Sequence, residues 1–125
     1  MKILLADDDR VLTTLLASRL RARGVDTIVA HDAMQVLMTA MRSAPDAIVL
    51  DIQMPGGTGL EALRKLKTSS KTSSIPVIVL SGSGTKDTPR EVTELGADEF
   101  LLKPVDPESL YQALCRATGQ TPSAT

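Results

Sequence analysis

Tryptophan is absent from this chain of 125 residues, and cysteine and histidine occur once each. The single cysteine, Cys115, excludes an internal disulfide and any metal site made from several cysteines, and the single histidine, His31, excludes a histidine cluster. The first apolar run, at 3–6, is too short for a signal peptide or a membrane span. A chain with a formal charge of −1 lacks the broad positive field that attracts nucleic acid or an anionic membrane.

What the chain does contain is ordinary for a folded domain. Hydrophobic residues make up 42% and charged residues 23%, which is too apolar a composition for disorder. The length predicts one domain with a single core. We therefore predict a small cytoplasmic domain, with no nucleic-acid and no membrane partner, over residues 1–119. Residues 120–125 are a polar tail or the start of a linker to an output domain.

Short runs of branched apolar residues alternate with helical patterns along the chain. The runs at 3–6, 27–30, 47–50, 77–80 and 100–102 are typical of strands buried on both faces of a parallel sheet. Apolar residues at helical spacing lie between them. The alternation predicts an α/β fold, doubly wound, with helices on both faces of the sheet.

Two helical stripes are expected to face the core. They consist of Leu12, Leu15, Leu16 and Leu20 in the first helix, and Met34, Leu37, Met38 and Met41 in the second. The methionines are interpreted as core filling rather than as a cofactor site. His31 is expected to be structural or solvent-facing, Cys115 an ordinary helix residue, and Tyr111 exposed. The serine- and threonine-rich segment 68–74 is expected to be mobile.

The fourth helix is expected to be short. Pro89 suits a first helical turn, because the N–H groups there have no partner within the helix. Val92 and Leu95 are the only apolar residues that follow it before Gly96. This pattern predicts a helix that begins at Thr88 or Pro89 and ends by Leu95, preceded by a mobile loop.

Acidic residues follow two of the apolar runs directly. Asp7 and Asp8 follow the first run and Asp51 follows the third, and the carboxyl ends of parallel strands are where ligands bind in open sheets. Three carboxylates within ~4–6 Å repel by several kcal/mol at an effective dielectric of ~20, so a cation is needed to hold them together. An all-oxygen site favours Mg²⁺. Asp9 is expected to cap the first helix instead.

Two further polar side chains follow strand ends. Ser81 comes after the fourth run, and Lys103, followed by Pro104, comes after the fifth. With strands ~4.8 Å apart, a hydroxyl and an ammonium there converge with the carboxylates on one shallow cleft.

Four segments in this order and spacing resemble the receiver domain of two-component response regulators, over residues 2 to about 118. They are KILLADDD (2–9), IVLDIQMPGGTG (48–59), VIVLSG (77–82) and GADEFLLKP (96–104). The resemblance implies a flavodoxin-like five-stranded sheet with strand order 2-1-3-4-5. It implies a phosphorylation-dependent signalling switch that catalyses only its own phosphoryl transfer and dephosphorylation, rather than a turnover enzyme.

The resemblance also implies a role for each site residue. Asp51 would accept a phosphoryl group from a sensor histidine kinase or a histidine phosphotransfer protein, with Ser81 and Lys103 as the other catalytic groups. Asp8 and Asp51 would bind Mg²⁺ directly, Asp7 would act on it largely through water, and the backbone carbonyl of Gln53 would be the remaining protein ligand. Phe100 would act with Ser81 and Lys103 in switching, and the Lys103–Pro104 peptide bond would be cis. The partner would dock over the first helix, at Val11, Thr14, Ser18 and Arg21, and over the loop from Lys103 into the last helix.

Three other functions compete with this one. The main alternative is a receiver-like protein-binding module that works without phosphorylation, although the chain keeps every acidic residue and the lysine. A haloacid dehalogenase-type hydrolase needs a second carboxylate where this chain has Gln53. The stretch 81–86 lacks the order of a nucleotide-binding phosphate loop. The resemblance further implies that the side chains two positions after Asp51 and after Ser81 influence how water reaches the phosphorus. Here they are Gln53, which can bind water but cannot act as a base, and Ser83, which is too short and uncharged to orient water well, so we predict slow self-dephosphorylation.

Overall fold

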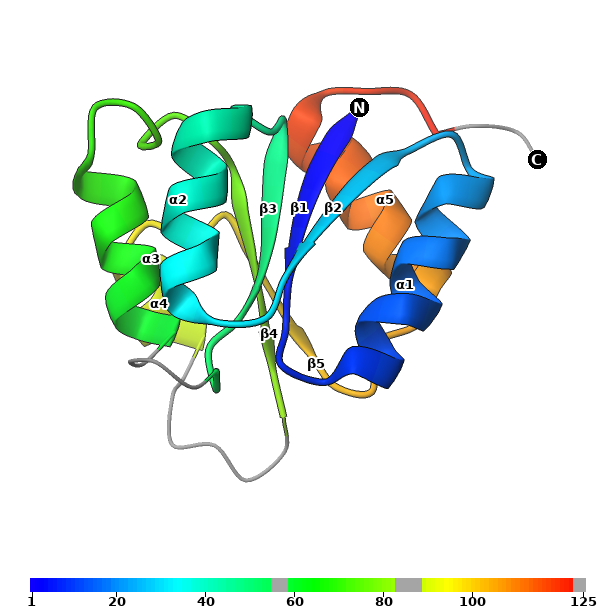
Figure 1. The fold of residues 1–125 in the computed structure, drawn as a ribbon, viewed down its shortest axis with the longest axis horizontal. Coiled ribbons are helices and arrows are strands. Elements are labelled where there is room, and N and C mark those ends of the chain that lie inside the picture. The colour runs from blue at the N-terminus through cyan, green and yellow to red at the C-terminus, as the bar shows by residue number, and fades with distance from the viewer. Residues whose placement is uncertain (55–58, 83–88, 123–125) are drawn as a thin grey trace.

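The computed structural model describes residues 1–54, 59–82 and 89–122, and five parallel strands form one sheet in the order β2-β1-β3-β4-β5 (Figure 1). The strands are β1 (Lys2–Ala6), β2 (Asp26–Ala30), β3 (Ala47–Asp51), β4 (Val77–Ser81) and β5 (Glu99–Leu102). The helices are α1 (Arg10–Ala22), α2 (Ala33–Ser43), α3 (Gly59–Thr68), α4 (Pro89–Glu94) and α5 (Pro107–Thr118). The predicted fold class and strand order are confirmed.

The helices cover both faces of the sheet. Helices α2, α3 and α4 lie on one face, and α1 and α5 lie on the other (Figure 1). Neighbouring residues of one strand therefore enter different cores: Leu4 packs with α2 and α3, whereas Leu5 packs with α1 and α5. Because both faces are covered, the strands are apolar at successive positions rather than at alternate ones.

The register of the sheet brings the polar strand ends to one edge. Ala6 pairs with Leu50 and Asp51 pairs with Leu80, so Asp7 and Asp51 leave the sheet side by side. Asp9 then begins α1 by accepting a hydrogen bond from the Leu12 amide at 3.0 Å, and this confirms its predicted role as a cap.

The predicted core stripe of α1 was wrong at one position. The buried stripe consists of Thr13, Leu16, Ala17 and Leu20, with Leu12 partly buried against it. Leu15 is 48% exposed, because it lies one residue outside this stripe. The prediction considered only the leucines, whereas Thr13 and Ala17 are small enough to pack close to the sheet and belong to the buried stripe.

The methionines of α2 are also not core residues. Its buried positions are Ala33, Val36 and Ala40, while Met34 is 68% exposed and Met38 and Met41 are similarly open. Only Leu37 of the predicted stripe packs against the core. Small residues let the helix approach the sheet closely, which turns the longer methionines toward solvent.

The expectation that Tyr111 is exposed was wrong. Tyr111 is 4% exposed, because its ring packs in the core with the Arg23 guanidinium 4.2 Å from its centroid. The segment 68–74 forms hydrogen-bonded turns, and buried Thr72 donates its hydroxyl to the Leu66 carbonyl at 2.6 Å. By contrast, the short fourth helix is confirmed at Pro89–Glu94. The mobile loop expected before it lies outside the described residues.

Gly59 permits a close approach of α3 to the end of β3. A Cβ at this position would lie 2.2 Å from Ile52 Cα and 2.7 Å from the Asp51 carbonyl oxygen. We expect Gly59→Ala to lower the free energy of unfolding by about 3 kcal/mol, as severe overpacking against backbone does. Urea titration followed by far-ultraviolet circular dichroism measures the change.

Gly24→Ala is the matched control for this substitution. Gly24 has φ +82° but nothing lies within 4 Å of an added Cβ, so the cost is limited to backbone strain of about 1 kcal/mol. Equal losses in the two variants would contradict the close approach of α3 and β3.

Candidate functional site

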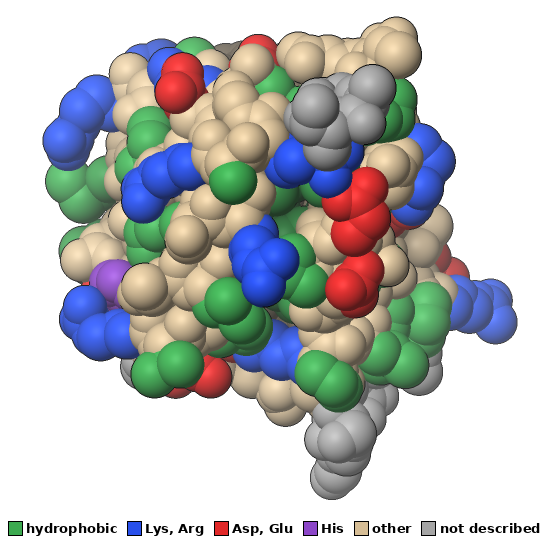
Figure 2. Space-filling model, turned by 90° about the vertical axis from the view of Figure 1, so that its right-hand side faces the viewer, with side chains coloured by type: hydrophobic (Ala, Val, Ile, Leu, Met, Phe, Trp, Pro, Cys, Tyr) green, Lys and Arg blue, Asp and Glu red, His purple; other side chains and the backbone are tan. Residues whose placement is uncertain are grey.

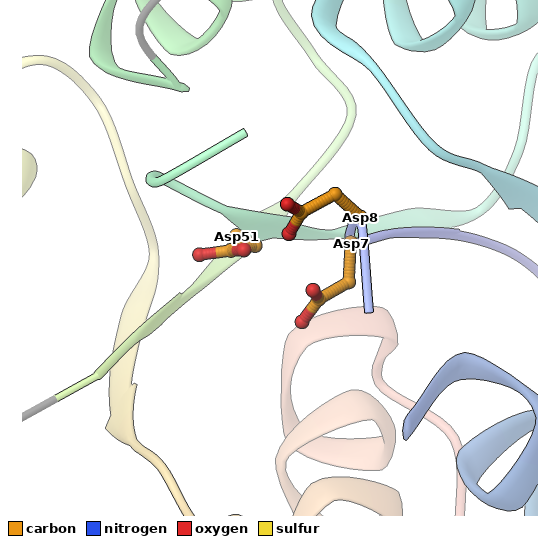
Figure 3. Close-up of side chains that lie close together, drawn as sticks. All are labelled: Asp7, Asp8 and Asp51. Carbon is orange, nitrogen blue, oxygen red and sulfur yellow. The ribbon is translucent and has the colours of Figure 1, made fainter. Parts of the chain in front are cut away.

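Three carboxylates meet at the carboxyl edge of the sheet. Asp7 and Asp8 come directly after β1 and Asp51 is the last residue of β3, so their side chains gather at one point (Figure 3). One oxygen of each lies within 4.8 Å of the others. Asp7 and Asp51 are buried and Asp8 is exposed. Two charges are thus withdrawn from water, and the third faces it.

Backbone amides and one ammonium hold the two buried carboxylates. Asp7 Oδ1 accepts a hydrogen bond from the Asp9 amide at 2.9 Å, and Asp51 Oδ1 accepts one from the Gln53 amide at 3.0 Å. Lys103 Nζ lies 2.7 Å from Asp7 Oδ2 and 3.4 Å from Asp51 Oδ2. The ammonium therefore bridges the free oxygens of both side chains.

The charges in this cluster are only partly compensated. Burial is the largest influence on Asp7 and raises its pKa; Lys103 and the Asp9 amide oppose the rise, and ionised Asp51 adds to it. Burial alone would lower the pKa of Lys103, but the two facing carboxylates outweigh it and raise that pKa. Lys103 therefore stays charged, while the ionised form of Asp7 is less favourable at this position than it is in water.

The donor set fits a hard divalent cation. Its oxygens are all carboxylate, and the oxygens around one Mg²⁺ lie about 3–4 Å apart, close to the spacing found here. Buried Asp7 Oδ2 accepts no hydrogen bond of normal geometry from any described residue, although the Lys103 ammonium lies beside it. A cation at this point would offset the burial, and the smaller repulsion from Asp51, that raise the pKa of Asp7.

The other predicted residues lie around the cluster. Ser81 is buried at the end of β4, and its hydroxyl is 3.4 Å from the Gly82 carbonyl oxygen. Phe100, on β5, packs partly buried against the core. The Lys103 side chain is 22% exposed, its amide donates to the Ser81 carbonyl at 2.8 Å, and the Lys103–Pro104 peptide bond is cis.

One residue beside the site was not assigned to it from the sequence. His31 Nδ1 lies 3.0 Å from the backbone carbonyl oxygen of Asp7. The two residues are 24 positions apart, and only the pairing of β1 with β2 brings them together. A single histidine after a strand carries no signal for such a contact.

The chain belongs to the response regulator receiver domain family, whose model matches residues 3–115. Its fold and the carboxylate cluster agree with this membership. Among the described helices, none is both long and apolar enough to span a membrane.

The chain is similar to several response regulators. It is 33% identical over 120 residues to the phosphate regulon transcriptional regulatory protein PhoB of Pseudomonas aeruginosa, covering 94% of this chain and 52% of that protein. It is 40% identical over 109 residues to the transcriptional regulatory protein CpxR of Escherichia coli, covering 87% and 45% respectively. The chain thus spans about half the length of these curated relatives.

A solved structure resembles it closely. The receiver domain of the sensor histidine kinase PA1611 from Pseudomonas aeruginosa has a TM-score of 0.86 and 27% identity, covering 95% of this chain and 98% of that one. That crystal structure contains a magnesium ion coordinated in the active-site cleft.

Proposed function

We propose that this domain is a phosphorylation-dependent switch that accepts a phosphoryl group on Asp51 with Mg²⁺ as cofactor. The observation that carries the proposal is the cluster of Asp7, Asp8 and Asp51 facing the Lys103 ammonium. The magnesium ion in the similar PA1611 receiver domain supports the choice of metal. Asp7, Asp8, Asp51 and the Gln53 carbonyl would bind it.

The transfer breaks one bond and forms another. An Asp51 carboxylate oxygen attacks phosphorus, the phosphorus–nitrogen bond of a phosphohistidine breaks, and the nitrogen keeps the electron pair. Bound Mg²⁺ would supply positive charge to the phosphoryl oxygens. Asp51 needs no deprotonation by a base, because its carboxylate is already the nucleophile.

Lys103 and Ser81 are suited to the other side of the phosphoryl group. Lys103 is a compact charge on a flexible stem, so its ammonium can leave Asp7 and follow a phosphoryl oxygen on Asp51. Among the described residues, the Ser81 hydroxyl makes one long contact, to the Gly82 carbonyl, and it can turn to donate to a phosphoryl oxygen on Asp51. Such a turn moves the β4 end, and Phe100 would move with it.

The partner is a sensor histidine kinase or a histidine phosphotransfer protein, and α1 is the surface we propose for its docking. Val11, Thr14, Ser18 and Arg21 are exposed, and Leu15 adds an apolar side chain that we expected in the core. Figure 2 shows hydrophobic side chains between lysines and arginines on the side of the molecule formed by α1. This mixture suits a specific protein contact.

We also propose that residues 1–119 are the receiver domain and that 120–125 are a tail or the start of a linker. The family match to residues 3–115 supports the first part. An output domain would follow in a longer protein, as the length of PhoB and CpxR suggests.

Treatment with acetyl phosphate tests this function directly. On a phosphate-affinity gel, we expect a retarded band when Mg²⁺ is present and none when it is chelated. A protein-binding module that works without phosphorylation would give no retarded band in either condition.

The phosphorylated state is expected to last minutes or longer. Gln53 is the nearest exposed side chain after Asp51, and a Cβ at Gly82 would lie only 3.2 Å from its Oε1, so its side chain reaches the residue that follows Ser81. An amide can bind water there but cannot take its proton. Ser83 lies outside the described residues. Decay of the retarded band after removal of acetyl phosphate measures the lifetime, and decay within seconds would contradict the prediction.

A further inference from the structure

We infer that His31 is a positioning residue for the metal site, because it fixes the peptide unit between the two ligands Asp7 and Asp8. This inference rests on the proposed function. Its basis is the contact of 3.0 Å between His31 Nδ1 and the Asp7 carbonyl oxygen, which bridges the ends of β1 and β2.

The contact takes the place of the next backbone hydrogen bond between β1 and β2. Asp7 donates its amide to the Ala30 carbonyl at 3.1 Å, so β1 and β2 are still paired at this point. In a parallel ladder, the next backbone amide of β2 would donate to the Asp7 carbonyl. Here Asp32 leaves the sheet to cap α2, and the His31 ring supplies the donor instead.

The carbonyl that His31 holds belongs to the peptide between two proposed ligands. The Asp7 carbonyl and the Asp8 amide share one plane, so the orientation of this carbonyl sets how Asp8 is placed relative to Asp7. The Asp7 side chain is already held by the Asp9 amide and Lys103. Without His31, the Asp7–Asp8 peptide can rotate, and the Asp8 carboxylate loses its direction toward the Asp7 and Asp51 carboxylates.

The position of His31 is itself fixed from α2. The backbone amide of His31 donates to Gln35 Oε1 at 2.8 Å, and the backbone amide of Gln35 donates to Asp32 Oδ1 at 2.8 Å. These bonds join the start of α2 to the end of β2. The imidazole is thus attached to a rigid element rather than to a free loop, as a positioning group requires.

The contact with the Asp7 carbonyl specifies which nitrogen of the His31 ring carries a hydrogen. A carbonyl oxygen only accepts hydrogen bonds, so Nδ1 must carry a hydrogen. An asparagine amide nitrogen occupies nearly the place of Nδ1, whereas a glutamine amide nitrogen corresponds to Nε2. His31→Asn should therefore keep the hydrogen bond to Asp7, and His31→Gln should lose it.

Magnesium titration of the whole chain, followed by calorimetry, tests the inference. We expect His31→Ala and His31→Gln to bind Mg²⁺ about tenfold more weakly than the wild type, as losses of groups that orient metal ligands do. His31→Asn should bind within about twofold of the wild type. Met34→Ala, which alters an exposed residue of α2, is the surface control and should bind normally.

A second readout needs no metal. Nuclear magnetic resonance correlates the Asp7 carbonyl carbon with the Asp8 amide, and this signal should shift in metal-free His31→Ala and return toward its place in His31→Asn. Unchanged affinity and an unchanged carbonyl signal in His31→Ala would overturn the inference while the proposed function stands. So would equal weakening in His31→Ala and His31→Asn. A wild-type protein that binds no Mg²⁺ would instead overturn the proposed function, and the inference with it.

Discussion

Asp51→Asn is expected to abolish phosphoryl labelling by acetyl phosphate while the fold is retained. Asp51 is buried at the end of β3, where one oxygen is held by the Gln53 amide and the other faces Lys103. An amide has nearly the same shape but is not a nucleophile toward phosphorus. Intact-protein mass spectrometry measures the labelled fraction, and circular dichroism checks the fold.

Asp26→Asn is the control for this loss. Asp26 is exposed and begins β2, at the opposite edge of the sheet, so its removal should leave labelling unchanged. Labelling of Asp51→Asn at the wild-type level would mean that another residue accepts the phosphoryl group.

Asp8→Asn is expected to separate metal binding from stability. Asp8 is the exposed member of the cluster, and its charge repels the two buried carboxylates. Removing it should leave the metal-free protein as stable as the wild type, or more stable by up to about 1 kcal/mol. The same change removes a ligand, so Mg²⁺ affinity should fall about a hundredfold or more, and labelling should fail.

Urea titration with and without Mg²⁺ measures both effects. Mg²⁺ at a hundred times its dissociation constant should stabilise the wild type by about 2.7 kcal/mol, and at the same concentration it should stabilise Asp8→Asn by about 0.4 kcal/mol or less. A variant that Mg²⁺ stabilises as much as the wild type, or that is labelled normally, would remove Asp8 from the ligand set.

The sheet was predictable because its signal is local. The apolar runs that contain Leu4 and Val49 are continuous, and this occurs where both faces of a strand are covered. The positions of Asp7 and Asp51 followed from the rule that parallel strands end at one edge. Their approach to Lys103 could be expected for the same reason.

The errors arose where helices pack. The stripe in α1 was assigned from its leucines, but buried Thr13 and Ala17 bring the helix close to the sheet and leave Leu15 outside. In α2, the small residues Ala33 and Ala40 are likewise buried against the sheet and leave the methionines outside the core. A small residue gives little signal in a hydrophobic pattern, although it sets which side of the helix faces inward.

The contact between His31 and Asp7 could not be predicted from sequence patterns at all. It depends on the register of β1 against β2 and on the direction in which the chain turns after Ala30. Both are properties of the assembled sheet, and no spacing along the chain encodes them.

We propose above all that Asp51 carries the phosphoryl group and that Mg²⁺ is required for its transfer. Borohydride reduces an aspartyl phosphate to homoserine, so reduction after acetyl phosphate treatment, followed by peptide mass spectrometry, locates the modified residue. We expect homoserine at position 51 when Mg²⁺ is present and unmodified aspartate when Mg²⁺ is chelated. Reduction at another aspartate, or at position 51 to the same extent without Mg²⁺, would contradict this proposal.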